Sequence, residues 1–238
     1  EKDYIATGHY ARIEYDKASQ RYLLKKAADK SKDQSYVLYV LSQAELSRTL
    51  FPLGGMSKNE VRRLAEEKGL INARKPDSQD ICFVKDGDYA GFLEREMGVK
   101  SIKGNFIDKN NAVMGKHEGI IHYTIGQRKG LGIAFGKPTY VIKKNKADNT
   151  VTLGSEEELY SDRLIADDIN LIAIGKLTSP MNVTVKTRYK QGESKATIFP
   201  LDEDKILVEF SEKQRAVTPG QAVVFYQEDV VIGGGTII

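Results

Sequence analysis

The second half of the chain is a succession of short β-rich segments, and this pattern limits the possible folds more than any other feature. Gly, Asn, Asp and Pro residues, which favour turns, separate the segments. The segments span residues 140–144, 151–153, 183–189, 196–199, 206–210, 222–226 and 230–238. Strands of this length and spacing predict an antiparallel sheet that closes into a small barrel at the C-terminal end.

Two of these segments carry further information. In residues 183–189, alternation puts Tyr189 on an apolar face with Val183 and Val185, whereas Arg188 falls on the opposite, basic face with Lys186. Tyr189 and Arg188 can therefore reach one ligand only if the strand ends or bulges before them. In the last segment, three consecutive glycines at 233–235 predict a bulge or a sharp bend.

The first 100 residues mix strands with helices. Residues 4–9 are predicted to form a buried strand that runs into a glycine turn, and residues 21–25 a second strand. Ser57 and Glu60 form the capping box of a helix that ends at Gly69. The apolar residues on one face of this helix are Val61, Leu64 and Ala65.

A second helix is predicted to begin at Asp88 and to stop at Gly98. Its expected buried residues are Tyr89, Phe92, Leu93 and Met97. The β-rich pattern begins after this helix. Together, these patterns predict an α+β chain with boundaries near residues 88 and 160.

Composition restricts the function classes. The net charge of +3 over 238 residues excludes a strongly basic protein, so a nucleic-acid surface would have to be a local patch, best placed in the middle third. The single cysteine, Cys82, excludes an internal disulfide framework and a multi-thiolate metal site. Without a signal peptide pattern or a long apolar run, we expect a cytoplasmic protein that does not bind a membrane.

Cys82 is the only possible sulfur nucleophile. Between Ile81 and Phe83, it could simply be a small buried apolar residue. A reactive role requires a thiolate, which nearby cations favour and nearby carboxylates oppose. Arg74, Lys75 and Lys85 flank the segment, but Asp77 and Asp80 lie within it. The local sequence leaves both readings open.

Two polar segments lie near the N-terminus. Gly8 and His9 follow a predicted strand, where ligands bind in open α/β sheets, although the segment could also be a plain turn. Residues 32–36 read Lys-Asp-Gln-Ser-Tyr, a combination suited to an unstacked base and its phosphate. The alternative for the second segment is a helix start with Asp33 as its N-cap.

The most unusual stretch is residues 122–132, which include the sequence GQRKGLG. Glycines allow a backbone to approach a ligand closely, and Arg128 with Lys129 could hold phosphate groups. The stretch contains neither GxGxxG nor the GK[ST] of a P-loop, so it does not indicate a nucleotide-binding motif. A tight glycine turn with solvated charges is the structural alternative.

These segments, in this order, resemble the bacterial tRNA-specific 2-thiouridylase family (MnmA/TrmU type). The similarity extends along the whole chain, and the most specific segments are those around Cys82 and the GQRKGLG loop. The further matching segments are residues 6–10, 32–36, 186–189 and 218–221. The resemblance implies the end of a pyrophosphatase-loop ATPase domain at 1–88, a small central domain at 89–160 and a C-terminal antiparallel β-barrel at 161–238.

The resemblance also implies a reaction. ATP adenylates the C2 oxygen of a tRNA wobble uridine, and sulfur carried as a cysteine persulfide then displaces AMP. Cys82 matches the catalytic cysteine that carries the persulfide, and Gly8 matches a residue that contacts ATP. The residues expected to contact tRNA by the same resemblance are His9, Lys32, Asp33, Gln34, Arg188, Tyr189 and Gln221. From the loop chemistry, we add Arg128 and Lys129 as candidates for holding tRNA phosphates.

Two family segments are not found among the 238 residues. These are the SGGxDS loop that holds the ATP phosphates and the PCxxCN segment that supplies another catalytic thiol. We therefore expect a truncated ATPase domain and no metal site, with ATP and Mg²⁺ used by a longer parent protein. We expect this chain alone neither to bind a cofactor tightly nor to thiolate tRNA.

The expected partners are tRNAs of lysine, glutamate and glutamine identity and a persulfide donor such as a cysteine desulfurase or a sulfur relay protein. Two other functions fit parts of the sequence. One is a non-catalytic tRNA- or RNA-binding module, which the barrel and the GQRKGLG loop would suit. The other is an ATPase of the same superfamily that acts on a small molecule, such as an amidating ligase, against which the Cys82 segment and the barrel both argue.

Overall fold

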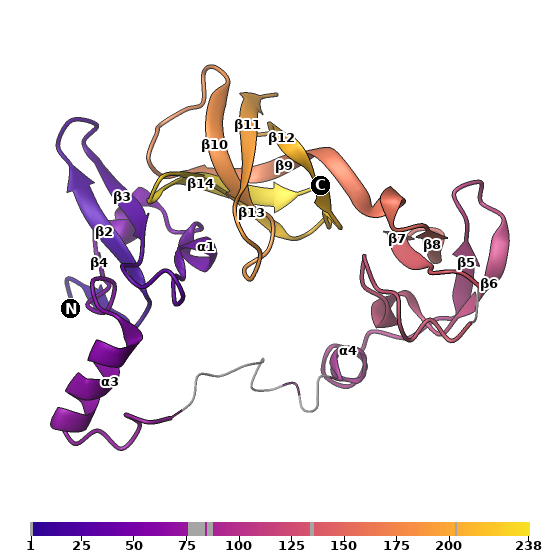
Figure 1. The fold of residues 1–238 in the computed structure, drawn as a ribbon, viewed down its shortest axis with the longest axis horizontal. Coiled ribbons are helices and arrows are strands. Elements are labelled where there is room, and N and C mark those ends of the chain that lie inside the picture. Colours follow the sequence, from indigo (N-terminus) through magenta and orange to yellow (C-terminus); the bar gives the residue numbers. More distant parts are fainter. Residues whose placement is uncertain (1, 76–83, 85–87, 134–135, 203) are drawn as a thin grey trace. The chain divides into compact units, whose positions relative to one another are not determined.

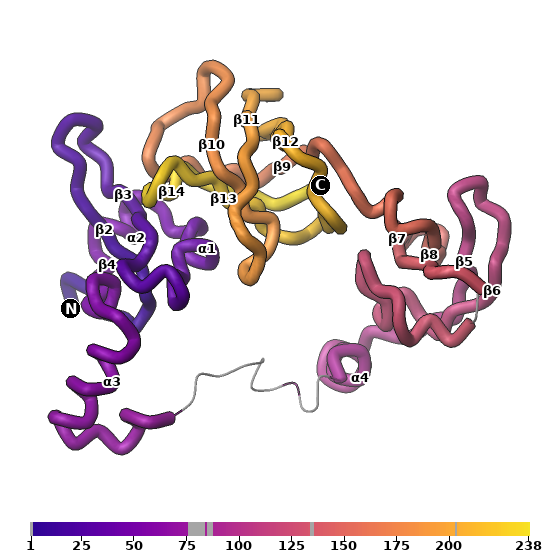
Figure 2. The backbone as a smooth tube through the Cα atoms, in the orientation of Figure 1, coloured from indigo at the N-terminus to yellow at the C-terminus, as the bar shows by residue number. Residues whose placement is uncertain are grey.

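The computed structural model describes residues 2–75, 84, 88–133, 136–202 and 204–238. They form two compact units. The first contains the described residues from 2 to 75, from 162 to 213 and from 219 to 238, and the second contains those from 84 to 161 and residues 214–218. Figures 1 and 2 show the path of the chain through both units. The first unit therefore combines the N-terminal segment with the C-terminal strands.

The predicted C-terminal barrel is confirmed. Six strands follow the order β13-β10-β11-β12-β9-β14, and pairing of β13 with β14 closes the ring (Figure 1). The strands are β9 (Tyr160–Leu171), β10 (Met181–Lys186), β11 (Ser194–Pro200), β12 (Ile206–Arg215), β13 (Ala222–Gln227) and β14 (Val230–Ile237). Alternate residues such as Val183, Val185 and Val208 are buried, as expected for a filled small barrel.

The N-terminal hairpin extends the barrel sheet. Strands β2 (Ala11–Asp16) and β3 (Arg21–Lys26) pair antiparallel, and β3 continues the sheet beside β14. The shared core includes Leu24 and Tyr36 from the N-terminal segment and Val224 and Tyr226 from the barrel. Burial of these large side chains in one cluster stabilises the two segments as one unit.

The three glycines at 233–235 form the predicted irregularity. The register of β14 shifts opposite both β13 and β9 in this region. A Cβ atom on Gly233 would lie 2.4 Å from the carbonyl oxygen of Asn170, and one on Gly235 would lie 2.5 Å from that of Asp167. Glycine is therefore required here because neighbouring backbones approach too closely for a side chain.

The N-terminal prediction was partly wrong. Only Ile5–Ala6 forms a strand (β1), which pairs in parallel with β4 (Thr49–Leu50), and Ile5 is 67% exposed rather than buried. Two short helices follow β3 along the chain, α1 (Ser35–Leu38) and α2 (Gln43–Leu46). The capping position of α1 is Gln34 rather than Asp33.

Both predicted longer helices are confirmed, but their expected burial is not. The capping box of Ser57 and Glu60 begins α3 (Lys58–Glu67), and Asp88 caps α4 (Tyr89–Met97), which ends at a left-handed Gly98. None of the described residues of α3 or α4 is buried, and Met97 is 66% exposed. The apolar faces are present in the sequence, but no described element covers them completely.

The second unit contains a four-stranded sheet with the order β6-β5-β8-β7. Its strands are β5 (Gly104–Ile107), β6 (Val113–His117), β7 (Tyr140–Asn145) and β8 (Thr150–Gly154), and it also holds the 3-10 helices η2 (Ile120–His122) and η3 (Glu157–Leu159). Phe106, Val141 and Val151 are fully buried in its core. Across the described parts of both units, no helix has the length and apolar character needed to cross a membrane.

Candidate nucleic-acid interface

The candidate site residues fall into three groups. Cys82 lies outside the described residues, so its role stays a prediction from sequence. The candidates near the N-terminus and those on the barrel belong to the first unit, whereas Arg128 and Lys129 belong to the second. The role of Arg128 and Lys129 in holding tRNA phosphates also stays a prediction.

Gly8 and His9 occupy the turn after β1. The imidazole Nδ1 of His9 lies 2.9 Å from the hydroxyl of Thr7, and its ring contacts that of Phe51 edge-on at 6.0 Å. Gly8 is exposed, and a Cβ atom there would make only an ordinary contact with Leu53 at 3.7 Å. Packing therefore does not require glycine at position 8, and its exposed backbone can be approached by a ligand.

The side chains of Asp33 and Gln34 serve the fold directly. One carboxylate oxygen of Asp33 accepts from the backbone N–H of Ala27 at 2.9 Å, and the other accepts from the hydroxyl of Ser35 at 2.7 Å. The amide oxygen of Gln34 accepts from the N–H of Tyr10 at 2.9 Å. These bonds position residues 32–36 beside Tyr10, the residue that follows His9. Lys32 remains partly exposed.

Tyr36 connects this segment to the barrel. It is only 6% exposed, and its hydroxyl donates to the carbonyl oxygen of Ala222 at 2.9 Å. Its ring lies 6.1 Å from that of Tyr189, and the ammonium of Lys186 lies 5.8 Å from the centroids of both rings. Burial raises the pKa of Tyr36 to about 12, and the nearby charge of Arg188 opposes this rise. The hydroxyl therefore remains a hydrogen-bond donor at neutral pH.

The end of β10 decides where Arg188 and Tyr189 point. The strand stops at Lys186, three residues before the predicted end, and residues 187–190 form a bend and turn. The hydroxyl of Thr187 donates to the amide oxygen of Gln191 at 2.8 Å within this turn. Because Arg188 and Tyr189 lie beyond the strand, the alternation of side chains between its two faces no longer places them on opposite sides. Tyr189 is 40% exposed.

Gln221 lies beside the same connection. It is exposed and directly precedes Ala222, whose carbonyl accepts the Tyr36 hydroxyl. Its own carbonyl accepts from the N–H of Ile237 at 2.9 Å, which fixes the start of β13 against the end of β14. Residues 32–36, 186–189 and 221 therefore meet around one buried tyrosine, and we call Tyr36, Lys186, Arg188, Tyr189 and Gln221 the tyrosine cluster.

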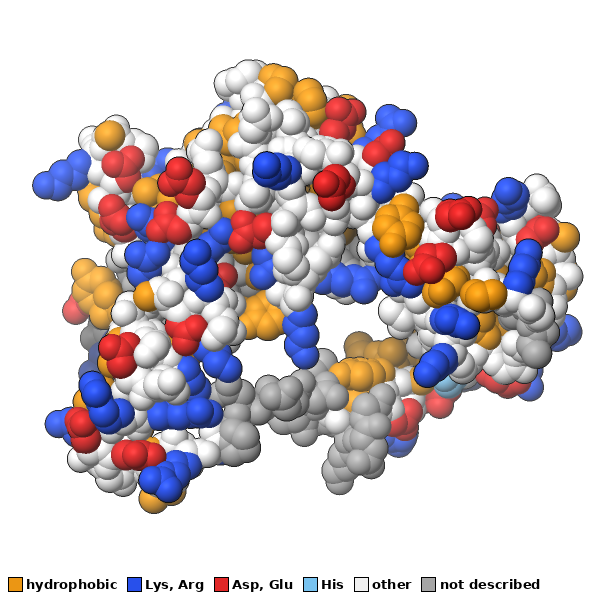
Figure 3. Space-filling model, viewed as in Figure 1, with side chains coloured by type: hydrophobic (Ala, Val, Ile, Leu, Met, Phe, Trp, Pro, Cys, Tyr) orange, Lys and Arg blue, Asp and Glu red, His pale blue; other side chains and the backbone are white. Residues whose placement is uncertain are grey.

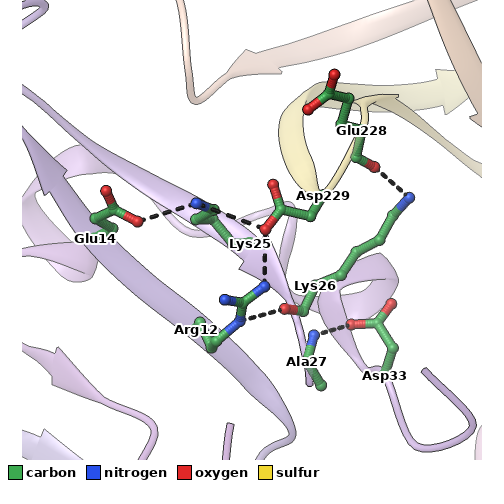
Figure 4. Close-up of polar contacts among 8 residues, drawn as sticks. All are labelled: Arg12, Glu14, Lys25, Lys26, Ala27, Asp33, Glu228 and Asp229. Atoms are coloured by element: carbon green, nitrogen blue, oxygen red, sulfur yellow. Dashed lines mark hydrogen bonds and ion pairs between the residues drawn. The ribbon is translucent and has the colours of Figure 1, made fainter. Parts of the chain in front are cut away.

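Ion pairs fix the N-terminal hairpin to the β13–β14 turn of the barrel (Figure 4). The guanidinium of Arg12 lies 2.8 Å from the carboxylate of Asp229, and the ammonium of Lys25 lies 3.6 Å from the same carboxylate. Lys26 donates to the carbonyl oxygen of Glu228 at 2.7 Å. These contacts span about 200 positions in sequence, and sequence patterns gave no signal for them.

In the second unit, the GQRKGLG loop is held by Gln127. Its amide oxygen accepts from the N–H of Thr124 at 2.9 Å, and its amide nitrogen donates to the carbonyl oxygen of Lys129 at 3.0 Å. Gly126, Gly130 and Gly132 have φ values of 87°, 75° and 74°, which favour glycine. Arg128 and Lys129 are exposed on this fixed loop.

Lys144 binds the backbone just before this loop. Its ammonium donates to the carbonyl oxygen of Tyr123 at 2.8 Å, and burial lowers the pKa of Lys144. Pattern analysis did not identify Lys144 or Gln127 as functional, because their roles depend on contacts with backbone groups. Figure 3 shows acidic and basic side chains interspersed over the viewed surface of the first unit, in line with the small net charge.

Three consecutive segments of the chain match models of known protein families. Residues 1–86 match the family model of the tRNA methyl transferase HUP domain, and residues 90–155 match that of the tRNA methyl transferase PRC-barrel domain. Residues 161–237 match the aminomethyltransferase β-barrel domain. The predicted fold class is confirmed: an α/β domain remnant, a central domain and a closed antiparallel barrel.

The proteins of similar sequence share one name. The chain is 54% identical over 235 residues to the tRNA-specific 2-thiouridylase MnmA of Acetivibrio thermocellus, and this match covers 99% of the chain and 66% of that relative. Relatives with the same name from Caldicellulosiruptor saccharolyticus and Clostridioides difficile are 54% and 51% identical, each with 99% of the chain and 65% of the relative covered. The chain thus spans about two thirds of the length of these relatives.

Proposed function

Because this chain belongs to the family of tRNA-specific 2-thiouridylases, we propose that it supplies the sulfur carrier and much of the tRNA surface of such an enzyme. The parent protein would convert the wobble uridine of tRNA to 2-thiouridine. The tyrosine cluster is the observation that supports this proposal most strongly. It places an exposed aromatic ring and two cations at one position, where N-terminal and barrel segments meet.

The chemistry of the tyrosine cluster suits RNA. Unstacked bases bind to exposed aromatic rings, and arginine and lysine bind the backbone phosphates. Tyr189 would stack on a base, while Arg188 and Gln221 would contact the adjoining backbone or base edges. In the second unit, Arg128 and Lys129 would hold tRNA phosphates on the rigid GQRKGLG loop. His9 and Lys32 would extend the surface of the first unit.

The proposed reaction uses groups of this chain together with groups from outside these residues. ATP would adenylate the C2 oxygen of the uridine with loss of pyrophosphate, with Gly8 contacting the nucleotide and Mg²⁺ accompanying it. The outer sulfur of a persulfide on Cys82 would then displace AMP from C2. A second thiol is needed to cleave the sulfur–sulfur bond, and it would come from outside these residues because Cys82 is the only cysteine.

The partners follow from this chemistry. We propose tRNAs of lysine, glutamate and glutamine identity as substrates in the cytoplasm. A cysteine desulfurase or a sulfur relay protein would load the persulfide. The other candidate is an RNA-binding module without catalysis, which the described surface would suit equally well.

Reconstitution with the parent protein distinguishes these two functions. Unmodified tRNA, ATP, Mg²⁺ and a persulfide donor are incubated with the protein, and 2-thiouridine is measured by mass spectrometry of the digested tRNA. We expect ATP-dependent 2-thiouridine. Tight tRNA binding without 2-thiouridine would favour the non-catalytic module.

A further inference from the structure

We propose that Lys186 is an additional tRNA-binding residue, and that its ammonium binds the backbone phosphate beside the base that stacks on Tyr189. This inference rests on the proposed function, since it assumes that tRNA occupies the tyrosine cluster. The resemblance to the family assigned contacts to Arg188 and Tyr189 but gave Lys186 no role. The geometry assigns Lys186 to the same subsite.

The position of Lys186 is fixed by the fold. It is the last residue of β10, opposite Val224 of β13. Its ammonium lies 5.8 Å from the ring centroids of both Tyr36 and Tyr189, whose rings are 6.1 Å apart. The 5.8 Å distances are near the outer limit of about 6 Å for a cation–π contact, so the ammonium lies beside both rings, and Lys186 remains partly exposed.

The charge of Lys186 is not neutralised locally. No ion pair joins Lys186 to a carboxylate of any described residue, whereas Lys26 pairs with Glu193 at 2.6 Å. The other oxygen of Glu193 accepts from the hydroxyl of Thr184, two residues before Lys186 on β10. Both carboxylate oxygens of Glu193 are therefore already bonded to Lys26 and Thr184, and Lys186 keeps its positive charge without an ion pair to any described carboxylate.

An RNA nucleotide fits this arrangement. Tyr189 offers a 40% exposed ring for a base, and the ammonium of Lys186 lies 5.8 Å over the centroid of that ring. The charge of Arg188 acts on neighbouring Tyr36. Tyr36 is buried and bonded to Ala222, so it supports the subsite without being a surface for stacking. One unstacked nucleotide would satisfy both the aromatic and the cationic groups.

The alternative is that Lys186 only orients Tyr189. The two roles differ in salt dependence, because a phosphate contact releases counterions whereas a packing contact does not. Lys186→Met keeps the aliphatic stem and removes the charge, and Lys186→Arg keeps the charge. Lys213→Met is the matched control, since Lys213 is exposed on β12, two strands from β10 in the barrel.

The experiment measures Kd for an unmodified lysine tRNA transcript with the 238-residue chain, from about 50 to about 400 mM KCl. We expect Lys186→Met to weaken binding at low salt and to flatten the slope of log affinity against log salt by about 1. The affinities of this variant and the unaltered chain should converge at high salt. Lys186→Arg and Lys213→Met should retain the original slope.

Two results would overturn the role of Lys186. One is an equal loss of affinity at every salt concentration, which would assign Lys186 to orienting Tyr189. The other is binding by Lys186→Met that equals that of the unaltered chain. If Lys186→Met does not fold by circular dichroism, Lys186→Gln replaces it. The proposed function is tested separately by tRNA binding of the unaltered chain and by 2-thiouridine formation, and both can hold while the role of Lys186 fails.

Discussion

The ring of Tyr36 lies 6.1 Å from the ring of Tyr189, with an angle of 55° between the two planes. Tyr36 belongs to a helix of the N-terminal segment, whereas Tyr189 follows a barrel strand 153 positions later in the sequence. The buried ring supports the exposed one. This contact joins the two segments from which the proposed tRNA surface is built.

Removing the Tyr36 hydroxyl should destabilise the first unit. Tyr36→Phe leaves the Ala222 carbonyl without its 2.9 Å hydrogen bond in a buried environment. We expect a loss of about 1 kcal/mol in the free energy of unfolding, measured by urea denaturation. Tyr160→Phe, at a tyrosine that is 43% exposed, should change stability much less and is the matched control. Equal effects of both changes would contradict the structural role of the Tyr36 hydroxyl.

Tyr189→Ala should weaken tRNA binding without changing its salt dependence. Loss of a base stacked on an aromatic ring costs roughly 1–3 kcal/mol, and no charge is removed. Tyr189→Phe should retain most of the affinity because the ring remains. Filter binding over a salt series measures both quantities. A Tyr189→Ala variant that binds tRNA as tightly as the unaltered chain would exclude stacking at this position.

The GQRKGLG loop should contribute phosphate contacts. Arg128→Ala combined with Lys129→Ala should weaken binding of every tRNA similarly and flatten the salt slope by about 1 to 2. Lys100→Ala combined with Lys116→Ala removes two exposed positive charges from the same unit and should have a smaller effect. An unchanged slope in the Arg128 and Lys129 variant would reduce the loop to a structural turn.

Acid should destabilise the second unit through His117. Its Nδ1 accepts from the N–H of Gly119 at 3.1 Å, and Nε2 lies 3.2 Å from the carbonyl oxygen of Asn149. Burial lowers the pKa of His117 from its ordinary value of 6.5, so the unfolded state binds the proton more readily. Protonation of Nδ1 would also place a second donor against the N–H of Gly119 and break this hydrogen bond. The contribution of His117 to the free energy of unfolding is therefore fully present above about pH 6.5. This contribution is lost as the pH falls through the lower pKa of His117 in the folded state.

Urea unfolding of the whole chain at pH 7.5 and pH 5.5 measures this effect of His117. His117→Gln should lower stability at pH 7.5 but reduce its dependence on pH between the two values. His9 in the first unit is the control, and His9→Gln should keep the pH dependence of the unaltered chain. The same pH dependence in the His117→Gln variant would show that other groups cause it.

Local chemistry explains which parts of the fold were predictable. The capping residues Ser57 and Asp88 act on the helix that follows them, so their signals appear in adjacent sequence. Strand β9 was not predicted because its sequence includes two consecutive aspartates, and pairing with β12 and β14 overrides that local preference. Ion pairs such as Arg12 with Asp229 form only after folding brings distant segments together.

The candidate site, too, depends on contacts that adjacent sequence does not reveal. Motif resemblance identified Tyr189 and Arg188, but the early end of β10, which allows both to reach one ligand, was visible only in the structure. Asp33 and Gln34 were expected to contact tRNA, and the structure shows their side chains bonded to Ala27, Ser35 and Tyr10 instead of simply facing solvent. Whether they also contact tRNA stays a prediction.

The central claim is that this chain carries the sulfur in tRNA thiolation, and Cys82→Ser in the parent protein tests it most directly. The measurement is 2-thiouridine in digested tRNA after incubation with ATP and a persulfide donor, together with Kd for the same tRNA. Since serine cannot carry a persulfide, the account predicts no 2-thiouridine and nearly unchanged tRNA binding. Formation of 2-thiouridine by the Cys82→Ser variant at the rate of the unaltered protein would contradict it.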